Sequence, residues 1–249
     1  MTKITAVVNA HREGLLAGPS LASFCEARAH AGNNGIEVES IFVLDRPDAL
    51  TRATIEHAGV DEVAVYETDF GDPAGARNFA AATGTGEFIA YLDADDLWSV
   101  NWLTAATEFC AKQHERVVAH SELNVVFGDV RNLWIHADSA DPEFDAGYLA
   151  VGNYWDALVF TWRDLMVEYP LISNDLRQGY GHEDWHWNCV TLLAGYHHRP
   201  VPDTLHFKRR RGGSQLSKCS DSDVVIYHTA MYAESRRLWS ERKRRSAQT

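Results

Sequence analysis

The sequence lacks several features that would place it outside the globular proteins. It has no internal repeat, no low-complexity tract and no apolar stretch long enough to cross a bilayer. Its content of 45% hydrophobic and 23% charged residues excludes the disordered and fibrous classes. Only four of its 249 residues are cysteines, none in a CxxC pair, and a chain of this size does not need disulfides. We therefore expect a folded globular chain with reduced thiols.

The chain also lacks an excess of positive charge. It has 23 Lys and Arg against 35 Asp and Glu, a formal net charge of −12, whereas a surface that binds nucleic acid needs an excess of lysine and arginine. We therefore expect no nucleic-acid partner. The first nine residues are strand-like and do not form a basic and apolar signal segment, which predicts a cytoplasmic protein.

Apolar, β-rich segments alternate with helical segments in the first half. Strands are expected at 4–8, 38–44, 63–66 and 88–92, and helices at 15–30, 49–57, 74–82 and 97–110. The helix at 74–82 follows Asp72 and Pro73, a capping carboxylate and a proline typical of a first helical turn. This alternation predicts an α/β fold with a mostly parallel central sheet flanked by helices.

The second half is less regular. Short apolar runs lie at 117–119, 124–127 and 133–135, and residues 223–245 are expected to form a helix with a basic end. Segment 236–245 has six basic residues and one acidic residue. Three interpretations remain open for it: a solvated helix end, peripheral contact with anionic lipid at the inner face of a membrane, or a homo-oligomer contact.

The most informative motif is acidic. The strand expected at 88–92 runs directly into Asp93, Asp95 and Asp96. The carboxyl edge of an open α/β sheet is where ligands bind, and clustered carboxylates suit Mn²⁺ or Mg²⁺ together with a diphosphate. One aspartate is explained by capping of a following helix, but three exceed what capping needs. We predict a metal site at Asp95, helped by Asp93, and a nucleotide diphosphate ligand.

Three further features, in order along the chain, join this motif. The first strand ends in the polar segment 9–13, the second strand ends at Asp45, and Gly75-Ala-Arg77-Asn78 comes before Gly84-Thr-Gly-Glu87 and the acid motif. The set resembles the nucleotide-binding half of glycosyltransferase family 2, the inverting GT-A enzymes, and the resemblance covers roughly residues 4–217.

The resemblance implies a single GT-A-like, Rossmann-type domain at residues 1–220, with a C-terminal helix at 221–249. Residues 1–113 would bind the nucleotide-sugar, and residues 114–220 would hold the acceptor. The implied donor is a nucleotide-diphospho-sugar, with a UDP-sugar favoured and a GDP- or TDP-sugar as alternatives. The implied acceptor is a glycan, a lipid-linked molecule or a small molecule.

The resemblance also assigns donor-binding residues. They are Asn9, His11, Glu13, Asp45, Arg77, Asp93, Arg209, Arg210 and Arg211. Segment 205–217 resembles the family's basic loop that closes over the diphosphate, although the family more often has histidine where this chain has Arg211. The alternative roles are loop capping for His11 and Asp45, and a solvated loop for the basic run.

Segment 181–187 contains Glu183 and Asp184 and resembles the family's acidic pair on the acceptor side. In the inverting mechanism a carboxylate accepts the proton of the acceptor hydroxyl as its oxygen attacks the anomeric carbon. We predict Asp184 as this base, with Glu183 as the alternative. A metal on Asp95 would counter the charge that develops on the leaving diphosphate.

A competing motif overlaps this pair. Residues His182, Glu183 and His186 match HExxH, which predicts a zinc-dependent hydrolase. That hypothesis gives the acid motif and the whole first half no role, so the transferase is favoured, and a non-catalytic nucleotide-binding module is a third possibility. The nearby tryptophans are expected either in the core or stacked on a sugar. They are Trp155, Trp162, Trp185 and Trp187.

Overall fold

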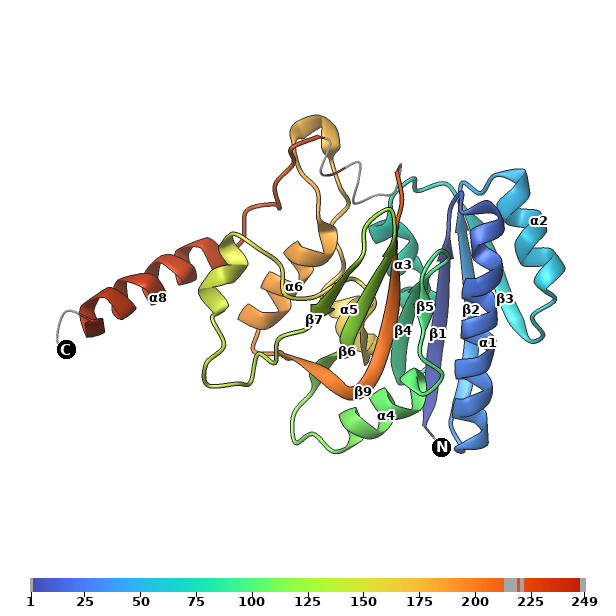
Figure 1. Cartoon of the computed structure of the whole chain (residues 1–249), viewed down its shortest axis with the longest axis horizontal. Coiled ribbons are helices and arrows are strands. Elements are labelled where there is room, and N and C mark those ends of the chain that lie inside the picture. Colours follow the sequence, from blue (N-terminus) through green and yellow to red (C-terminus); the bar gives the residue numbers. More distant parts are fainter. Residues whose placement is uncertain (1, 213–218, 220–221, 247–249) are drawn as a thin grey trace.

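A single curved sheet forms the centre of the molecule in the computed structural model, which describes residues 2–212, 219 and 222–246 (Figure 1). Its strands are β1 (Lys3–Ala10), β2 (Glu37–Asp45), β3 (Val63–Thr68), β4 (Phe88–Asp93), β5 (Leu97–Trp98), β6 (Val117–Gly128), β7 (Asn132–Ile135), β8 (Phe160–Trp162) and β9 (His197–Arg210). The strand order is β3-β2-β1-β4-β8-β6-β9-β5, and β7 pairs with β6. Strands β3, β2, β1 and β4 pair in parallel, as the alternation predicts.

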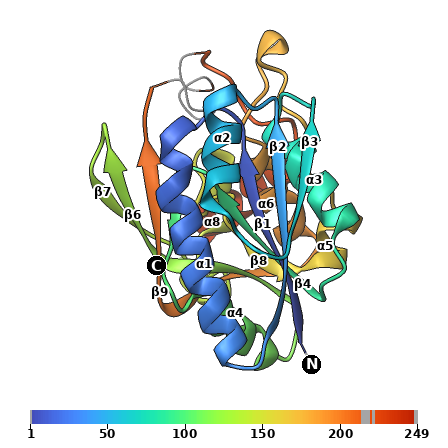
Figure 2. The same cartoon turned by 90° about the vertical axis from the view of Figure 1, so that its right-hand side faces the viewer.

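Helices cover both faces of the sheet. They are α1 (Ala17–Asn33), α2 (Ala49–Ala58), α3 (Pro73–Thr83), α4 (Trp102–Ala111), α5 (Arg163–Glu168), α6 (Glu183–Leu193) and α8 (Met231–Ser246), with short 3-10 helices η1 (Gly14–Leu16), η2 (Ala146–Ala150) and η3 (Leu176–Gln178). Figure 2 shows α1 and α2 side by side across one face, with α3 and α5 on the other. Helix α8 projects from the body beside η2 (Figure 1).

The apolar strands are buried on both sides because alternate side chains enter two separate cores. On β1, Ile4, Ala6 and Val8 pack toward α1 and α4, whereas Val7 packs toward α3 and α5. On β4, the Leu92 side chain enters the first core and that of its neighbour Tyr91 enters the second. A parallel sheet covered on both faces therefore gives continuous apolar runs in the sequence.

The expected helix at 97–110 is wrong at its start. Leu97 and Trp98 form β5, which pairs antiparallel with β9, and α4 begins at Trp102. The buried indole of Trp98 stacks on Phe24 of α1 with ring centroids 5.9 Å apart, so tertiary packing fixes an extended conformation here. This pairing places the basic end of β9 beside the acid motif.

Three other expectations need correction or completion. Segments 117–119 and 124–127 are parts of one strand, β6. The C-terminal helix begins at Met231, eight residues later than expected, because Val225 forms backbone hydrogen bonds with the segment at 179–181. The expected basic loop is strand as far as Arg210, and its residues 213–217 lie outside the described residues.

None of the described helices is both long and apolar enough to cross a membrane.

Candidate active site

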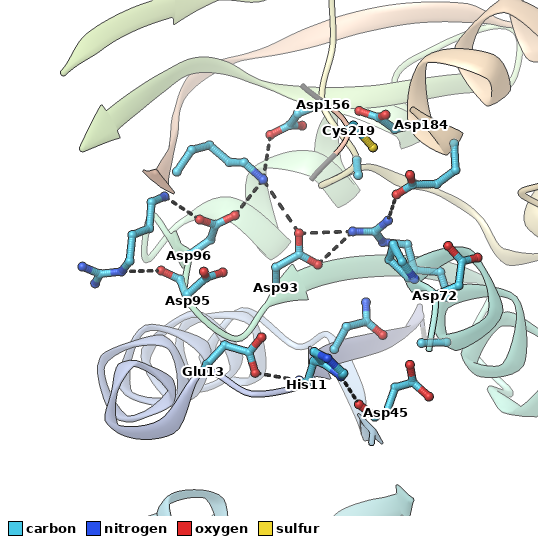
Figure 3. A pocket seen from close by; sticks show the side chains of 18 of the residues that line it. His11, Glu13, Asp45, Asp72, Asp93, Asp95, Asp96, Asp156, Asp184 and Cys219 are labelled. Carbon is cyan, nitrogen blue, oxygen red and sulfur yellow. Dashed lines mark hydrogen bonds and ion pairs between the residues drawn. The ribbon is translucent and has the colours of Figure 1, made fainter. Parts of the chain in front are cut away.

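A cavity of about 640 Å³ opens at the carboxyl edge of the parallel strands. Its volume lies within the range of small-molecule sites. Every residue predicted for the site lines it: Asn9, His11, Glu13, Asp45, Arg77, Asp93, Asp95, Glu183, Asp184, Arg209, Arg210 and Arg211. Figure 3 shows the acid motif with His11, Glu13 and Asp45 on one side and Asp156 and Asp184 on the other.

The ends of β1 and β2 form one wall of the cavity. The Nδ1 atom of His11 contacts the backbone carbonyl of Asp45, and the backbone N–H of His11 donates to Glu13 Oε2 at 2.6 Å. Burial is the main reason why the pKa of Glu13 is raised. Asp45 Oδ1 accepts a hydrogen bond from the backbone N–H of Phe70 at 2.7 Å. Asp45 therefore fixes a loop while its carboxylate stays on the cavity wall.

Arg77 joins the acid motif to the acidic pair of α6. One terminal nitrogen donates to both carboxylate oxygens of Asp93, at 2.9 and 3.1 Å, and the other donates to Glu183 Oε1 at 2.9 Å. Burial opposes the charge of Arg77, but these carboxylates outweigh burial and raise its pKa. Both terminal nitrogens are engaged. The geometry thus favours a bridge between two motifs over the diphosphate contact expected for Arg77.

Lys208, which belongs to the basic segment 205–217 but was not among the residues predicted for the site, lies against the acid motif. Its Nζ atom is 2.6 Å from Asp96 Oδ2, 3.7 Å from Asp156 Oδ2 and 3.8 Å from Asp93 Oδ2. Burial lowers the pKa of Lys208, but the three carboxylates outweigh burial and raise it. Lys208 is therefore a buried permanent cation that neutralises part of the acid motif.

Strand periodicity is the signal that could have identified Lys208. Successive side chains of a strand point to opposite faces. Lys208 and His206 are buried on one face of β9, whereas Phe207 and Arg209 on the other face are partly exposed. Asp156 follows no recognisable motif, so only the structure could assign it.

The β9 strand also holds Asp95 and Asp96. Arg211 Nε donates to Asp95 Oδ2 at 2.7 Å. The backbone N–H of Arg209 donates to Asp96 Oδ1 at 2.6 Å, and its Nε donates to the backbone carbonyl of Asp95 at 3.1 Å. The Arg209 guanidinium lies 4.4 Å from the ring centroid of Phe127, a cation–π contact. The basic run and the acid motif therefore form one charged cluster.

The donor set of this cluster fits a metal only in part. Among the described residues, no group of three or more His, Cys, Asp or Glu side chains is placed to hold a metal ion. Mg²⁺ commonly binds through one or two carboxylates, waters and substrate phosphates. Asp95 suits this arrangement, because its carboxylate lines the cavity and its ion pair is with the partly exposed Arg211. Asp93 is less suited, since Arg77 engages both of its oxygens.

The acidic pair at the start of α6 contains two carboxyl groups in different surroundings. Glu183 is 6% exposed; Arg77 binds its Oε1, and Asn174 Nδ2 donates to its Oε2 at 2.8 Å. Asp184 has a long contact of 3.5 Å with Asn153 Nδ2 and accepts a hydrogen bond from the backbone N–H of Trp185, and it has no salt bridge within the described part of the chain. Burial, and then the negative charge of Glu183, raise the pKa of Asp184 to about 7. Asp184 can therefore accept a proton near neutral pH.

Asn174 also explains why Asp72 does not cap α3 with its side chain. Asp72 occupies the N-cap position and Pro73 the first turn, as expected, but no hydrogen bond joins the Asp72 side chain to the helix. Its Oδ1 accepts instead from Asn174 Nδ2 at 2.9 Å. The expected side-chain cap is wrong, because Asn174 links Asp72 to Glu183.

The first histidine of the HExxH motif lies outside the helical conformation. His182 is the N-cap residue of α6, with a φ of 59° in the left-handed region, and its carbonyl accepts the backbone N–H of His186 at 3.0 Å. Glu183, the general-base position of the motif, is engaged by Arg77. These observations disfavour a zinc site at this segment.

The tryptophans divide between core and cavity. Trp155 and Trp187 are buried, and their indole N–H groups donate to backbone carbonyls, each at 2.7 Å. Trp162 packs on Phe88 with ring centroids 5.1 Å apart. Trp185 lines the cavity, as does Trp134 of β7, to which the sequence analysis gave no role. These two rings remain as surfaces on which a sugar can stack.

The sequence matches the model of the family described as Glycosyl transferase family 2 over residues 5–155. A search of curated proteins found no sequence that matches the chain.

Solved structures resemble this chain in fold. TarS 1-349 from S. aureus in complex with UDP-GlcNAc has a TM-score of 0.64 and 17% identity, and the match covers 95% of this chain and 65% of that one. Mannosyltransferase PcManGT from Pyrobaculum calidifontis, in complex with GDP-Man and Mn²⁺, has a TM-score of 0.61 and 15% identity, with coverage of 85% and 58%. This chain thus spans less than two thirds of either neighbour. The similarity confirms the expected α/β architecture.

Proposed function

The chain belongs to glycosyltransferase family 2 and has a GT-A-type fold, and from this premise we propose that it transfers a sugar from a nucleotide-diphospho-sugar to an acceptor hydroxyl with inversion of the anomeric carbon. One observation supports the proposal most directly. The same cavity has a cluster of cations and carboxylates at the end of β4 and, on α6, Asp184, which forms no salt bridge among the described residues. These are the two functions that the reaction needs: stabilisation of a leaving diphosphate and removal of a proton.

We assign the nucleoside to the wall formed by Asn9, His11 and Asp45. The side-chain amide of Asn9 has both polar atoms buried without a hydrogen-bond partner among the described residues, so it can bond to a ligand. Asp45 adds a hydrogen-bond acceptor, which suits a base or ribose with N–H or O–H donors. The UDP-GlcNAc and GDP-Man of the two similar structures support a nucleotide-sugar donor of this general kind.

We assign the diphosphate to the basic end of β9, with Arg209, Arg210 and Arg211. Arginine forks match phosphate oxygens, and all three side chains line the cavity. Asp95 is the residue that would hold Mn²⁺ or Mg²⁺ when it binds, and such an ion supplies Lewis-acid stabilisation of the leaving group. Arg77 and Lys208 are positioning residues in this scheme, because they fix Asp93, Asp96 and Glu183.

We assign proton removal to Asp184. A base works best when its pKa lies near the working pH, and burial gives Asp184 a pKa of about 7. Glu183 is the weaker candidate because Arg77 and Asn174 engage both of its oxygens. Trp134 and Trp185 line the same cavity as Asp184, which favours a glycan or another sugar-bearing acceptor.

The division of the chain follows from these roles. We propose residues 1–113 as the nucleotide-sugar half, residues 114–220 as the acceptor half, and residues 221–249 as a C-terminal segment without a catalytic role. Helix α8 packs on η2 through a face that includes the buried Met231 and Ser235. Its exposed basic face stays open to the membrane or oligomer contact proposed from the sequence.

Calorimetric titration of UDP, GDP, CDP and TDP tests the function, with Mn²⁺, with Mg²⁺ and without metal. We expect one nucleotide to bind more tightly with metal, and this dependence to be lost in Asp95→Ala. The configuration of the transferred sugar, followed by NMR with the donor so identified, tests inversion. If no nucleotide binds under any condition, the transferase proposal is wrong.

A further inference from the structure

Arg211 differs from the other cations that pair with the acid motif, because it also contacts Glu13. Its Nε donates to Asp95 Oδ2 at 2.7 Å, and its Nη2 lies 3.5 Å from Glu13 Oε1. The Glu13 carboxylate is itself held by the backbone N–H of His11. One guanidinium therefore bridges two carboxylates from the ends of two neighbouring strands.

Arg77, Lys208 and Arg211, the three cations that form ion pairs with carboxylates of the acid motif, differ in how easily they can move. The side chains of Arg77 and Lys208 are 4% and 9% exposed, whereas that of Arg211 is 28% exposed. Moving Arg77 or Lys208 would leave buried carboxylates without a counter-charge, which is strongly unfavourable. Arg211 can turn toward a phosphate in the cavity at lower cost, because its guanidinium keeps an anionic partner throughout.

A divalent cation cannot share Asp95 with Arg211 without cost. Two positive groups at one carboxylate repel each other, and the charge-assisted hydrogen bond from Arg211 must be broken or shared. The residue best placed to hold a metal is therefore already neutralised by a cation of the protein when no ligand is bound.

We propose that Arg211 is the cation of Asp95 in the nucleotide-free protein and that a donor diphosphate, by drawing Arg211 to its own oxygens, frees Asp95 for the divalent cation. The metal then binds with the nucleotide or after it. This inference rests on the proposed function, since the diphosphate is the group that Arg211 exchanges for Asp95.

Mn²⁺ binding without nucleotide tests the exchange directly. The EPR signal of free Mn²⁺ would be titrated with wild type, Arg211→Gln and the double variant Arg211→Gln/Asp95→Asn. We expect Arg211→Gln to bind Mn²⁺ about tenfold more tightly than wild type, the size expected for removal of one charge-assisted hydrogen bond, and the double variant to lose this gain. A gain in affinity cannot result from misfolding.

Arg199→Gln is the matched control. Arg199 lies on β9, the strand that ends one residue before Arg211, and forms a similar ion pair, with Nη2 2.8 Å from Asp138 Oδ2, and it does not line the cavity. We expect its Mn²⁺ affinity to equal that of wild type. The exchange is refuted if Arg211→Gln binds Mn²⁺ no more tightly than wild type, if Arg199→Gln gains as much, or if the gain persists without Asp95.

A second titration adds UDP or GDP, with protein-free nucleotide as the blank for chelation. We expect nucleotide to tighten Mn²⁺ binding about tenfold in wild type and clearly less in Arg211→Gln. If nucleotide tightens Mn²⁺ binding equally in both proteins, the exchange is refuted. If wild type binds neither nucleotide in calorimetry, the proposed function fails for these donors, and the nucleotide-free titration still decides the contact between Arg211 and Asp95.

Discussion

Two groups of carboxylates face each other across one cavity, and their partners differ. At the end of β4, Asp93, Asp95 and Asp96 each pair with a cation. At the start of α6, Asp184 has no salt bridge among the described residues, and burial raises its pKa to about 7. Burial also raises the pKa of Asp96 to about 7, although the charge of Lys208 opposes this shift. The two groups therefore differ in the ion pairs that hold their carboxylates and not in pKa alone.

Removal of Lys208 should have the largest effect, because it breaks the cation-paired side. In Lys208→Met, Asp96 and Asp156 stay buried without their counter-charge, and we expect the free energy of unfolding to fall by about 3 to 5 kcal/mol. Urea denaturation measures this change. Arg52→Gln, which removes an exposed pair with Glu67, is the control and should change stability far less than Lys208→Met. Equal losses in both variants would contradict a special role for Lys208.

Asp184→Asn tests the unpaired side. Loss of the general base should lower kcat by a factor of about 10² to 10⁴ while the Kd for nucleotide stays within twofold of wild type, because Asp184 is assigned to the acceptor. Turnover and calorimetry, with the donor identified by titration, measure the two quantities. A normal kcat in Asp184→Asn together with an inactive Glu183→Gln would show that Glu183, and not Asp184, is the base.

The pH profile sharpens the comparison. Only ionised Asp184 can accept a proton, so kcat/KM should fall as pH drops below about 7, by about tenfold per pH unit. The negative charge of Glu183 is the second cause of the raised pKa. Glu183→Gln should therefore shift this limb to lower pH. A limb that stays in place or moves upward would show that Glu183 does not set the pKa of Asp184.

The smallest expected effect is the change with pH in the Tm difference between Asp184→Asn and wild type. The folded pKa of Asp184 lies above its ordinary value, so the stability that its protonated form contributes is present at low pH and is lost as pH rises through about 7. Asp184→Asn cannot ionise. Its Tm relative to wild type should therefore be about 5 to 10 °C higher at pH 8 than at pH 5. Calorimetric scans at the two pH values measure this, and an equal or smaller difference at pH 8 would show that burial of Asp184 costs no stability.

Local pattern was sufficient for the first half of the fold. The expected strands at 4–8, 38–44, 63–66 and 88–92 all lie within β1 to β4, because each is rich in β-forming apolar residues and contributes side chains to the two cores. The pattern failed at residues 97 and 98. A helical sequence became strand there because Trp98 packs on α1 and pairs with β9, a partner more than 100 residues later in the sequence.

The sequence by itself determined which residue types gather at the cavity. Parallel strands end at a common edge, so every residue predicted from the strand ends, the acidic pair and the basic run lies there. Only the tertiary structure decided which ion-pair partner and which charge each of these side chains has. Arg77 and Glu183 are 106 residues apart in the chain, and Lys208 reaches Asp96 only because β5 pairs with β9. Charge state depends on distances between side chains and on burial, and neither is set by local sequence.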